Sequence, residues 1–86
     1  MSESSAALEF ARYVLEQICD HKSDIQADQK DDELGTLISV QINEEDMGRL
    51  IGKNGKTVSA LRLLVRAMGA REGKKINLKV LEPVAK

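Results

Sequence analysis

Apolar and polar positions follow two different rhythms along the chain, one typical of helices and one typical of strands. The helical rhythm predicts a first helix over about residues 6–20, with a core face formed by Leu8, Ala11, Val14, Leu15 and Ile18. Ser4 or Ser5 is placed to cap the start of this helix. A weaker alternation over residues 23–34 predicts a short edge strand that ends in an acidic hairpin loop.

The middle of the chain combines a strong strand pattern with a short helix. Residues 36–42 are rich in β-branched side chains and predict a strand whose core face carries Ile38, Val40 and Ile42. Asn43 is suited to cap a short helix, because acidic residues fill the next turn, where the helix dipole favours negative charge. This helix ends at Gly52 and offers to the core Met47, Leu50 and Ile51.

A second long helix is predicted over about residues 56–68. Its core face carries Val58, Leu61, Leu64, Val65 and Met68. Gly69 or Gly73 can end it, and an alternating apolar pattern over residues 76–80 predicts a last strand before Pro83. The predicted order is helix, strand, strand, helix, helix, strand, which is an α+β fold with a three-stranded sheet.

The length of 86 residues allows one domain with one modest hydrophobic core. We therefore expect a single domain over residues 1–86, with the first helix and the acidic hairpin over about 5–34 and the rest of the domain over about 35–82. The hydrophobic content of 42% and the charged content of 31% are those of an ordinary soluble globular protein. The chain has no apolar run of about 18 residues and no signal-peptide pattern, so we expect a cytoplasmic location without membrane contact.

Side chains suited to catalysis or metal binding are scarce. Cys19 falls in the apolar rhythm of the first helix, which favours a buried structural thiol over a reactive one. His21 follows that helix directly, where a solvated side chain or a charge at the helix C-terminus is expected. Residues 55–57 resemble the Gly-Lys-Thr end of a P-loop, but Leu50 stands where that motif needs its first glycine. We therefore expect no enzyme activity, no metal site and no cofactor.

Charge is distributed unevenly, although the formal net charge is −1. Residues 1–46 contain 12 acidic and 3 basic side chains, whereas residues 47–86 contain 10 basic and 2 acidic side chains. The C-terminal half is therefore suited to attract an anionic ligand. Mutual attraction of the two halves on folding is the alternative explanation of the same asymmetry.

Two glycines with two residues between them mark the centre of the chain, between an apolar pair and the second long helix. Gly52 and Gly55 lack Cβ atoms, so the turn between them can bring its backbone close to a ligand. Lys53 and Lys56 contribute positive charge and Asn54 an amide. The first N–H groups of the following helix are unpaired and carry partial positive charge. This combination predicts a site for phosphate groups.

Residues 51–58, Ile-Gly-Lys-Asn-Gly-Lys-Thr-Val, resemble the GXXG loop of a KH RNA-binding domain. The longer run over 46–62 resembles the KhpA family of small bacterial single-KH proteins, and the resemblance covers nearly the whole chain. It implies a type II KH fold with the order α-β-β-α-α-β and the helices on one face of the sheet. Few residues remain after Leu81 for the additional strand and helix of the type I arrangement.

The resemblance implies binding of single-stranded RNA with little sequence preference, in the role of an RNA chaperone or post-transcriptional regulator. In KH domains the loop clamps the backbone of about four nucleotides. Carried over to this chain, that role falls on a set of loop residues and their neighbours, namely Gly52, Lys53, Asn54, Gly55, Lys56 and Arg49. The bases would lie in an apolar groove, whose candidate floor residues are equally suited to the plain core: Ile38, Val40, Ile51 and Val58.

Composition also bears on the type of RNA binder. Phe10 and Tyr13 are the only aromatic residues and both fall in the first helix, so no aromatic stacking platform is available. We therefore expect weak binding by a single domain. Further cations could widen the basic surface, although a solvated helix face explains several of them equally well: Arg62, Arg66, Arg71, Lys74, Lys75 and Lys79.

A second apolar stripe on the long helix predicts a homodimer interface formed by Ala60, Leu63, Leu64 and Ala67. Cover by the sheet and the first helix is the alternative. The KhpA resemblance implies self-association and pairing with a KH protein of the KhpB or Jag type. A protein-interaction module with a KH shape and little RNA binding is the rival function, favoured by the acidic pI of 5.8 and opposed by Lys53 and Lys56.

Overall fold

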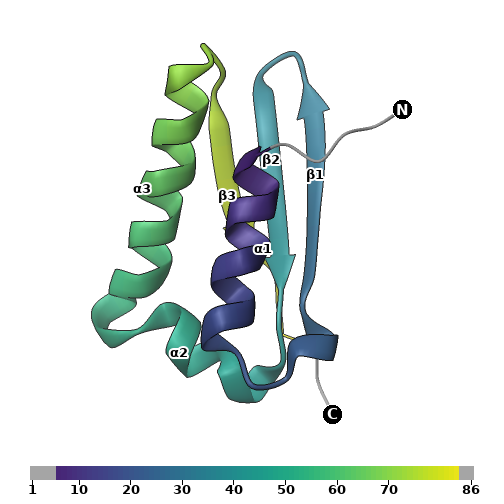
Figure 1. The fold of residues 1–86 in the computed structure, drawn as a ribbon, viewed down its shortest axis with the longest axis vertical. Helices are drawn as coiled ribbons and strands as arrows, with labels where there is room; N and C mark the ends of the chain where they lie inside the picture. The colour runs from purple at the N-terminus through teal and green to yellow at the C-terminus, as the bar shows by residue number, and fades with distance from the viewer. Residues whose placement is uncertain (1–5, 84–86) are drawn as a thin grey trace.

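The computed structural model describes residues 6–83 as one three-stranded sheet with helices on one of its faces (Figure 1). Three short 3-10 turns precede or join the longer elements, at Lys22–Asp24, Glu44–Asp46 and Lys53–Gly55. The helices and strands are, in order, α1 (Ala6–Ile18), β1 (Gln26–Asp32), β2 (Gly35–Gln41), α2 (Met47–Ile51), α3 (Lys56–Arg71) and β3 (Ile76–Val80). The α+β fold and the order of its elements agree with the prediction. The proposed caps Ser4 and Ser5 lie outside the described residues.

The sheet has the order β1-β2-β3 and is mixed. β1 and β2 form an antiparallel hairpin, whereas β2 and β3 run parallel, with Ile38 opposite Leu78. Parallel neighbours need a crossover connection, and α2 and α3 supply it. Figure 1 shows α1 crossing in front of the sheet and α3 running beside β3 in the opposite direction. β1 and β3 are therefore the two edge strands, as predicted for β1.

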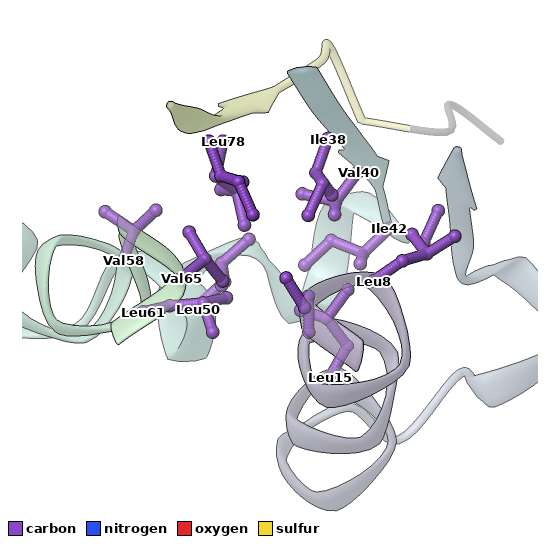
Figure 2. Close-up of a cluster of buried hydrophobic side chains, with 14 of the residues drawn as sticks. Leu8, Leu15, Ile38, Val40, Ile42, Leu50, Val58, Leu61, Val65 and Leu78 are labelled. Carbon is purple, nitrogen blue, oxygen red and sulfur yellow. The ribbon is translucent and has the colours of Figure 1, made fainter. Parts of the chain in front are cut away.

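One hydrophobic core lies between the sheet and the helices (Figure 2). The strand residues predicted to face it are fully buried at Ile38, Val40 and Ile42. From the helices, the core receives chiefly Leu15, Leu50, Leu61 and Val65. Burying one such side chain contributes roughly 1.5–3 kcal/mol before the entropy cost of folding is subtracted.

Two side chains predicted for the core are exposed instead. Ile51 is 41% exposed and Leu64 is 48% exposed. Each directly follows or precedes a fully buried residue, Leu50 or Val65, and consecutive helical positions differ by about 100° around the axis. Since α2 has one turn and one contact face, it buries Leu50 and turns Ile51 outward.

The helix α3 runs to Arg71, past the predicted end at about residue 68. Of the two glycines predicted to end it, Gly73 is confirmed, because it follows the C-cap residue Glu72 with φ 73°. Gly69 is buried, and a Cβ atom there would lie 2.6 Å from Ile76 Cγ1 and 2.8 Å from the carbonyl oxygen of Lys74. The missing side chain therefore allows the start of β3 to pack directly against the helix. Gly69 serves as a point of close approach and not as a helix end.

The chain has one cysteine. Cys19 is buried, and burial, followed by the charge of Asp46, raises the pKa of its thiol to about 11. This agrees with the predicted structural role, because the reactive form of cysteine is the thiolate. Across residues 6–83, every helix is too short or too polar to span a bilayer.

Candidate nucleic-acid interface

The loop between α2 and α3 has a backbone that only a few residue types adopt easily. Gly52 has φ 69° and ψ −169°, Asn54 has φ 58° and ψ 30°, and Gly55 has φ 75° and ψ 15°. Asn54 is the one non-glycine residue with positive φ among residues 6–83, and asparagine tolerates this left-handed region better than most residues. The local sequence Gly-Lys-Asn-Gly therefore fits a tight left-handed turn that leads into α3.

The two glycines of the loop serve different purposes. A Cβ atom on Gly52 would collide with the side chain of Thr57 and lie 3.1 Å from its backbone nitrogen. A Cβ atom on Gly55 would meet no other atom within 4 Å. Gly52 is thus required by packing inside the protein, whereas Gly55 leaves open space beside the backbone. That space is available to a ligand that approaches the start of α3.

The polar side chains of the loop point away from the core. Lys53, Asn54 and Lys56 are exposed, and Gly52 and Gly55 are partly exposed. The amide of Lys56 donates to the carbonyl oxygen of Lys53, so one of the first N–H groups at the helix start is already paired. The loop therefore offers two lysines, an amide side chain and an accessible backbone at one end of α3.

A largely apolar groove of about 470 Å³ adjoins the loop, between α2 and α3 on one side and the end of β3 on the other. It is lined by Met47, Ile51, Val58, Arg62, Val80, Leu81, Glu82 and Pro83. Ile51 and Val58 were predicted for such a groove. Ile38 and Val40 were the other candidates, and both belong to the core because the sheet turns them under the helices, where they are fully buried.

Sequence reasoning missed part of this groove. Met47 was assigned to the core and Val80 to the alternating pattern of the last strand. Both are partly buried against the core and also line the groove. Leu81 was not considered, although it continues the apolar run after β3. Its amide donates to the carbonyl oxygen of Val40 over 2.8 Å, which ties this segment to the sheet. The parallel pairing of β2 with β3, which the sequence pattern does not specify, brings Leu81 to the groove.

Arg62 connects the groove to the exposed edge of the sheet. Its Nε atom donates to the carbonyl oxygen of Leu78 over 3.2 Å. This contact satisfies an acceptor on the edge strand β3 and fixes the direction of the guanidinium group. A guanidinium has five N–H donors, so this bond leaves its two terminal nitrogens for other acceptors. Arg62 thus brings a positively charged hydrogen-bonding group to a groove whose other lining residues are apolar except for Glu82.

Arg49, the remaining predicted RNA-binding residue, is engaged in an ion pair. Its Nη1 atom lies 2.8 Å from Asp20 Oδ2, and this contact raises the pKa of the arginine. A second, longer contact reaches the carbonyl oxygen of Ile18 at 3.4 Å. Arg49 therefore ties α2 to the end of α1, and the pairing with Asp20 offsets its charge toward a ligand.

Asp46 strengthens the same junction from inside. It is 2% exposed and accepts hydrogen bonds from the amides of Asp20 and His21, at 3.1 and 3.0 Å, and from the His21 ring at 3.2 Å. Burial opposes its ionisation, but the hydrogen bonds from His21 and Asp20 outweigh this, and the pKa of Asp46 lies below its ordinary value. The carboxylate thus holds the start of α2, and with it the loop, against α1.

For His21 the sequence predicts a solvated side chain or a charge at the C-terminus of α1, and the structure adds carboxylate partners that were not predicted. Its ring lies between two carboxylates, 3.2 Å from Asp46 and 3.2 Å from Glu45. Asn43 completes the junction as the predicted cap, because its side chain accepts from the Glu45 amide over 2.7 Å. Within residues 6–83, no group of histidine, cysteine and carboxylate side chains is arranged to hold a metal ion.

The predicted dimer residues lie on the side of α3 that faces away from the core. Leu63 is 67% exposed, and Leu64, Ala60 and Ala67 are exposed as well. A hollow of about 350 Å³ beside them lies between α1 and α3 and is lined by Val14, Lys56, Thr57, Ala60, Leu61 and Leu64. Neither the sheet nor α1 covers these side chains within the protomer.

Comparison with known proteins agrees with this geometry. A family model described as "KhpA/KhpB, KH domain" matches residues 8–80. The RNA-binding protein KhpA of Leifsonia xyli is 36% identical over 70 residues, which cover 81% of this chain and 90% of that protein. The RNA-binding protein KhpA of Listeria monocytogenes is 33% identical over 69 residues, which cover 80% of this chain and 91% of that protein.

Among solved structures, Aquifex aeolicus Era bound to GDP.AlF4- superposes with a TM-score of 0.59 at 18% identity. The match covers 91% of this chain and 30% of the Era chain. At that identity, the similarity concerns the fold alone. The family match over residues 8–80 and the identities to the two KhpA proteins carry the assignment: the chain belongs to the KhpA/KhpB family of KH-domain proteins.

Proposed function

We propose that this chain binds single-stranded RNA, with the loop at residues 52–55 holding the sugar-phosphate backbone and the adjoining groove accepting the bases. The relatives in Leifsonia xyli and Listeria monocytogenes are both named RNA-binding proteins, which supports the class of ligand. The observation that carries the proposal is the accessible Gly55 backbone between exposed Lys53 and Lys56. Phosphate groups favour such a combination of accessible backbone and positive charge.

The groove supports recognition of bases by shape and apolar contact. Ile51, Val58 and Leu81 provide aliphatic surface, and the described groove residues include no aromatic ring. Stacking on an aromatic side chain contributes roughly 1–3 kcal/mol per base, and this protein does without that contribution. We therefore propose weak binding with little sequence preference, which suits an RNA chaperone or a post-transcriptional regulator that contacts many transcripts.

Replacing the two loop-tip residues tests the proposed site. The variant Lys53→Asp/Asn54→Asp places two negative charges against the phosphates and should lower the affinity for a single-stranded RNA by at least about tenfold. A matched control, Lys22→Asp/Gln26→Asp, makes the same charge change at exposed positions before and within β1. Fluorescence anisotropy measures the affinities, and circular dichroism checks that all three proteins are folded.

The salt dependence sharpens the same experiment. For a single strand, the logarithm of the association constant falls with the logarithm of salt concentration by roughly 0.7 per phosphate contact. The loop variant should show a shallower slope than the wild type and the control. Equal affinities of the loop variant and the control would eliminate the loop as the RNA site. Absence of salt-dependent RNA binding in the wild type would favour the rival function, a protein-interaction module with a KH shape.

A homodimer formed through α3 is a second proposal, favoured by the exposed apolar side chains on its outer side. Leu63 and Leu64 present large apolar surface to solvent, and the hollow lined by Val14 and Ala60 lies beside them. Contact with a second copy would remove this surface from water. Two weak RNA sites in one dimer would also raise the apparent affinity through effective concentration.

Sedimentation equilibrium tests the dimer with a matched pair of variants. Leu63→Glu should convert a wild-type dimer into a monomer, because it buries a charge in the proposed interface. Leu34→Glu is the control, since Leu34 is 84% exposed in the β1–β2 hairpin and lines a different hollow from the predicted dimer residues. Equal monomeric masses for all three proteins would end the dimer proposal. Because the family description names KhpB beside KhpA, we propose the same face of α3 for a KhpB or Jag-type partner.

A further inference from the structure

A second hollow continues the α3–β3 seam beyond the groove. It has a volume of about 470 Å³ and is lined by Arg66, Lys74, Lys75, Ile76 and Asn77. The groove beside the loop is lined by Val58, Arg62 and the residues that end β3. The second hollow lies beside the residues that begin β3. Both hollows therefore lie between the same helix and the same edge strand.

The periodicity of α3 aligns the two hollows. Val58, Arg62 and Arg66 are spaced by four residues, so they lie along one face of the helix. At a rise of about 1.5 Å per residue, Arg66 lies roughly 15 Å along the axis from Lys56. Figure 1 shows β3 running alongside α3. The seam thus begins at the loop lysines, passes Arg62 and ends at the second group of cations.

The second group of cations is held in place by backbone contacts. The amide of Lys74 donates to the carbonyl oxygen of Gly69 over 2.8 Å, and the buried Gly69 allows this close approach. The carbonyl oxygen of Lys75 accepts from the Thr36 amide over 2.8 Å. These bonds fix the backbone of the turn between α3 and β3. The side chains of both lysines remain exposed.

The charged side chains that line this hollow on the α3 side are all positive, whereas those on the hairpin side are both positive and negative. Across residues 6–83, no carboxylate lines the hollow that contains Arg66. Lys74 and Lys75 also line a separate hollow that contains Asp31, Asp32 and Glu33. The hairpin carboxylates partly offset the two lysines, so Arg66 faces the smallest competing charge. An anion would therefore be attracted to the α3 side of the turn.

We infer that Arg66, Lys74 and Lys75 form a second phosphate-binding site for a single RNA strand that continues past the loop along the α3–β3 seam. This inference rests on the proposed function and extends it. A loop of this type holds about four nucleotides. A longer strand that follows the seam reaches the second cations, so the protein binds RNA longer than the loop and groove require. Asn77, which also lines the hollow, supplies an amide for sugar or phosphate oxygens.

The experiment measures how the affinity for RNA of two lengths changes when cations of the second site are removed. Oligouridines of about 5 and 12 nucleotides are titrated into the full chain and followed by NMR amide shifts, which report weak binding. The test variant is Arg66→Gln/Lys74→Gln, and the control Lys22→Gln/Lys30→Gln removes the same charge from exposed positions outside α3 and β3. Because a longer strand has more binding registers on every variant, the control corrects for that statistical gain.

The test variant should lose about five- to tenfold in affinity for the 12-nucleotide strand, and its salt slope should fall by roughly 1.4 for two lost contacts. Its affinity for the 5-nucleotide strand should match that of the control. In the wild type, the longer strand should shift the amides of Lys74 and Asn77, while the shorter strand should shift those of the loop. Both lengths weakened equally, or neither weakened beyond the control, would overturn the second site.

The loop variant Lys53→Asp/Asn54→Asp separates this inference from the proposed function. If it binds both lengths as tightly as the wild type, the loop is not the RNA site and the proposed function fails. If it loses both lengths while Arg66→Gln/Lys74→Gln behaves like its control, the loop site stands and the second site is refuted. The two failures therefore give different results.

Discussion

At each edge of the sheet an arginine binds a carbonyl oxygen of the edge strand, but the side chains around the two edges differ in charge. At the β1 edge, Arg12 of α1 donates from Nη2 to the carbonyl oxygen of Ala27 over 3.0 Å. At the β3 edge, Arg62 of α3 donates from Nε to the carbonyl oxygen of Leu78 over 3.2 Å. In both cases an arginine from a covering helix reaches over the core and satisfies an acceptor on an edge strand.

The surroundings of the two arginines differ. β1 has the sequence Gln-Ala-Asp-Gln-Lys-Asp-Asp, and Glu33 follows it in the hairpin. β3 has the sequence Ile-Asn-Leu-Lys-Val and borders the apolar groove, with the loop lysines at one end and Arg66 at the other. Carboxylates along β1 repel phosphate and also discourage pairing with another strand. We therefore propose that an exposed strand edge serves as a nucleic-acid site only where positive charge and a neighbouring groove occur together.

The largest expected effect concerns Leu50, a core side chain that lies beneath the sheet shared by both edge strands. Leu50→Ala should lower the free energy of unfolding by about 2–5 kcal/mol, because Leu50 is fully buried in the core shared by the helices and the sheet. Its neighbour Ile51 lies in the groove on the β3 side. Ile51→Ala should therefore cost under about 1 kcal/mol and lower RNA affinity by about three- to tenfold.

Urea denaturation and RNA titration of the two variants measure these effects at adjacent positions. Each variant acts as the control of the other, since both remove an aliphatic side chain from α2. Similar losses of stability in both would mean that Ile51 belongs to the core after all. An unchanged RNA affinity of Ile51→Ala would remove the groove from the proposed site.

A second prediction concerns the junction that joins the α1 side of the molecule to the loop side. Asp46→Asn should destabilise the protein at neutral pH, because an amide accepts with one oxygen where the carboxylate accepts three hydrogen bonds with two. The effect depends on pH in a defined direction. The pKa of Asp46 is lowered on folding, so its contribution is complete above the ordinary value of 3.8 and is lost as pH falls through the folded value.

Urea midpoints of wild type and Asp46→Asn, measured as a function of pH, test this. The gap between them should be open above pH 3.8 and should close below it as Asp46 of the wild type becomes protonated. Glu44→Gln is a suitable control in the same turn, since Glu44 is exposed. A gap that stays constant down to the lowest pH would show that ionisation of Asp46 does not contribute to the stability of the protein.

A third prediction compares the two edge arginines directly. Arg12→Ala and Arg62→Ala each remove one hydrogen bond from a charged donor to an edge carbonyl, so each should cost about 0.5–1.5 kcal/mol of stability. Arg62→Ala should in addition lower RNA affinity by about three- to fivefold, the effect of one phosphate contact at physiological salt. Equal effects of both variants on RNA affinity would show that net charge matters and that the position of Arg62 in the groove does not.

These comparisons also indicate how far the sequence could predict the molecule. The alternation at Ile38, Val40 and Ile42 predicted the buried face of β2 and the burial of the residue that follows its end, and the turn residues of the loop predicted the position of the loop. Such features depend on local chemistry: period-two burial, a capping Asn43 and glycines where φ is positive. They were predictable because each depends only on residues close together in the sequence.

The errors arose at residues whose burial or contacts depend on packing between elements that are distant in the sequence. Ile51 and Leu64 fit a helical core pattern, but whether a border position is buried depends on how the helix is rotated against the sheet. The roles of Arg12, Arg62 and Asp46 depend on contacts between residues 15 to 26 positions apart in the chain. No local pattern specifies such contacts. The groove wall at Leu81 likewise depends on the parallel pairing of β2 with β3.

The smallest expected effect tests whether charge alone separates the two edges. Asp28→Lys changes the charge of the β1 edge by two units at an exposed position. Since the Debye length is about 10 Å at 0.1 M salt, the affinity for RNA bound on the β3 side should rise by less than about twofold at low salt, and the gain should vanish at high salt. The salt slope should stay that of the wild type, because the β1 edge gains no groove and therefore no stable phosphate contact. A slope steeper by roughly 0.7 would mean that one lysine is enough to recruit a phosphate there. In that case positive charge alone would be enough to bind a phosphate at the β1 edge. The groove between α3 and β3 would then not be required for RNA binding at the β3 edge.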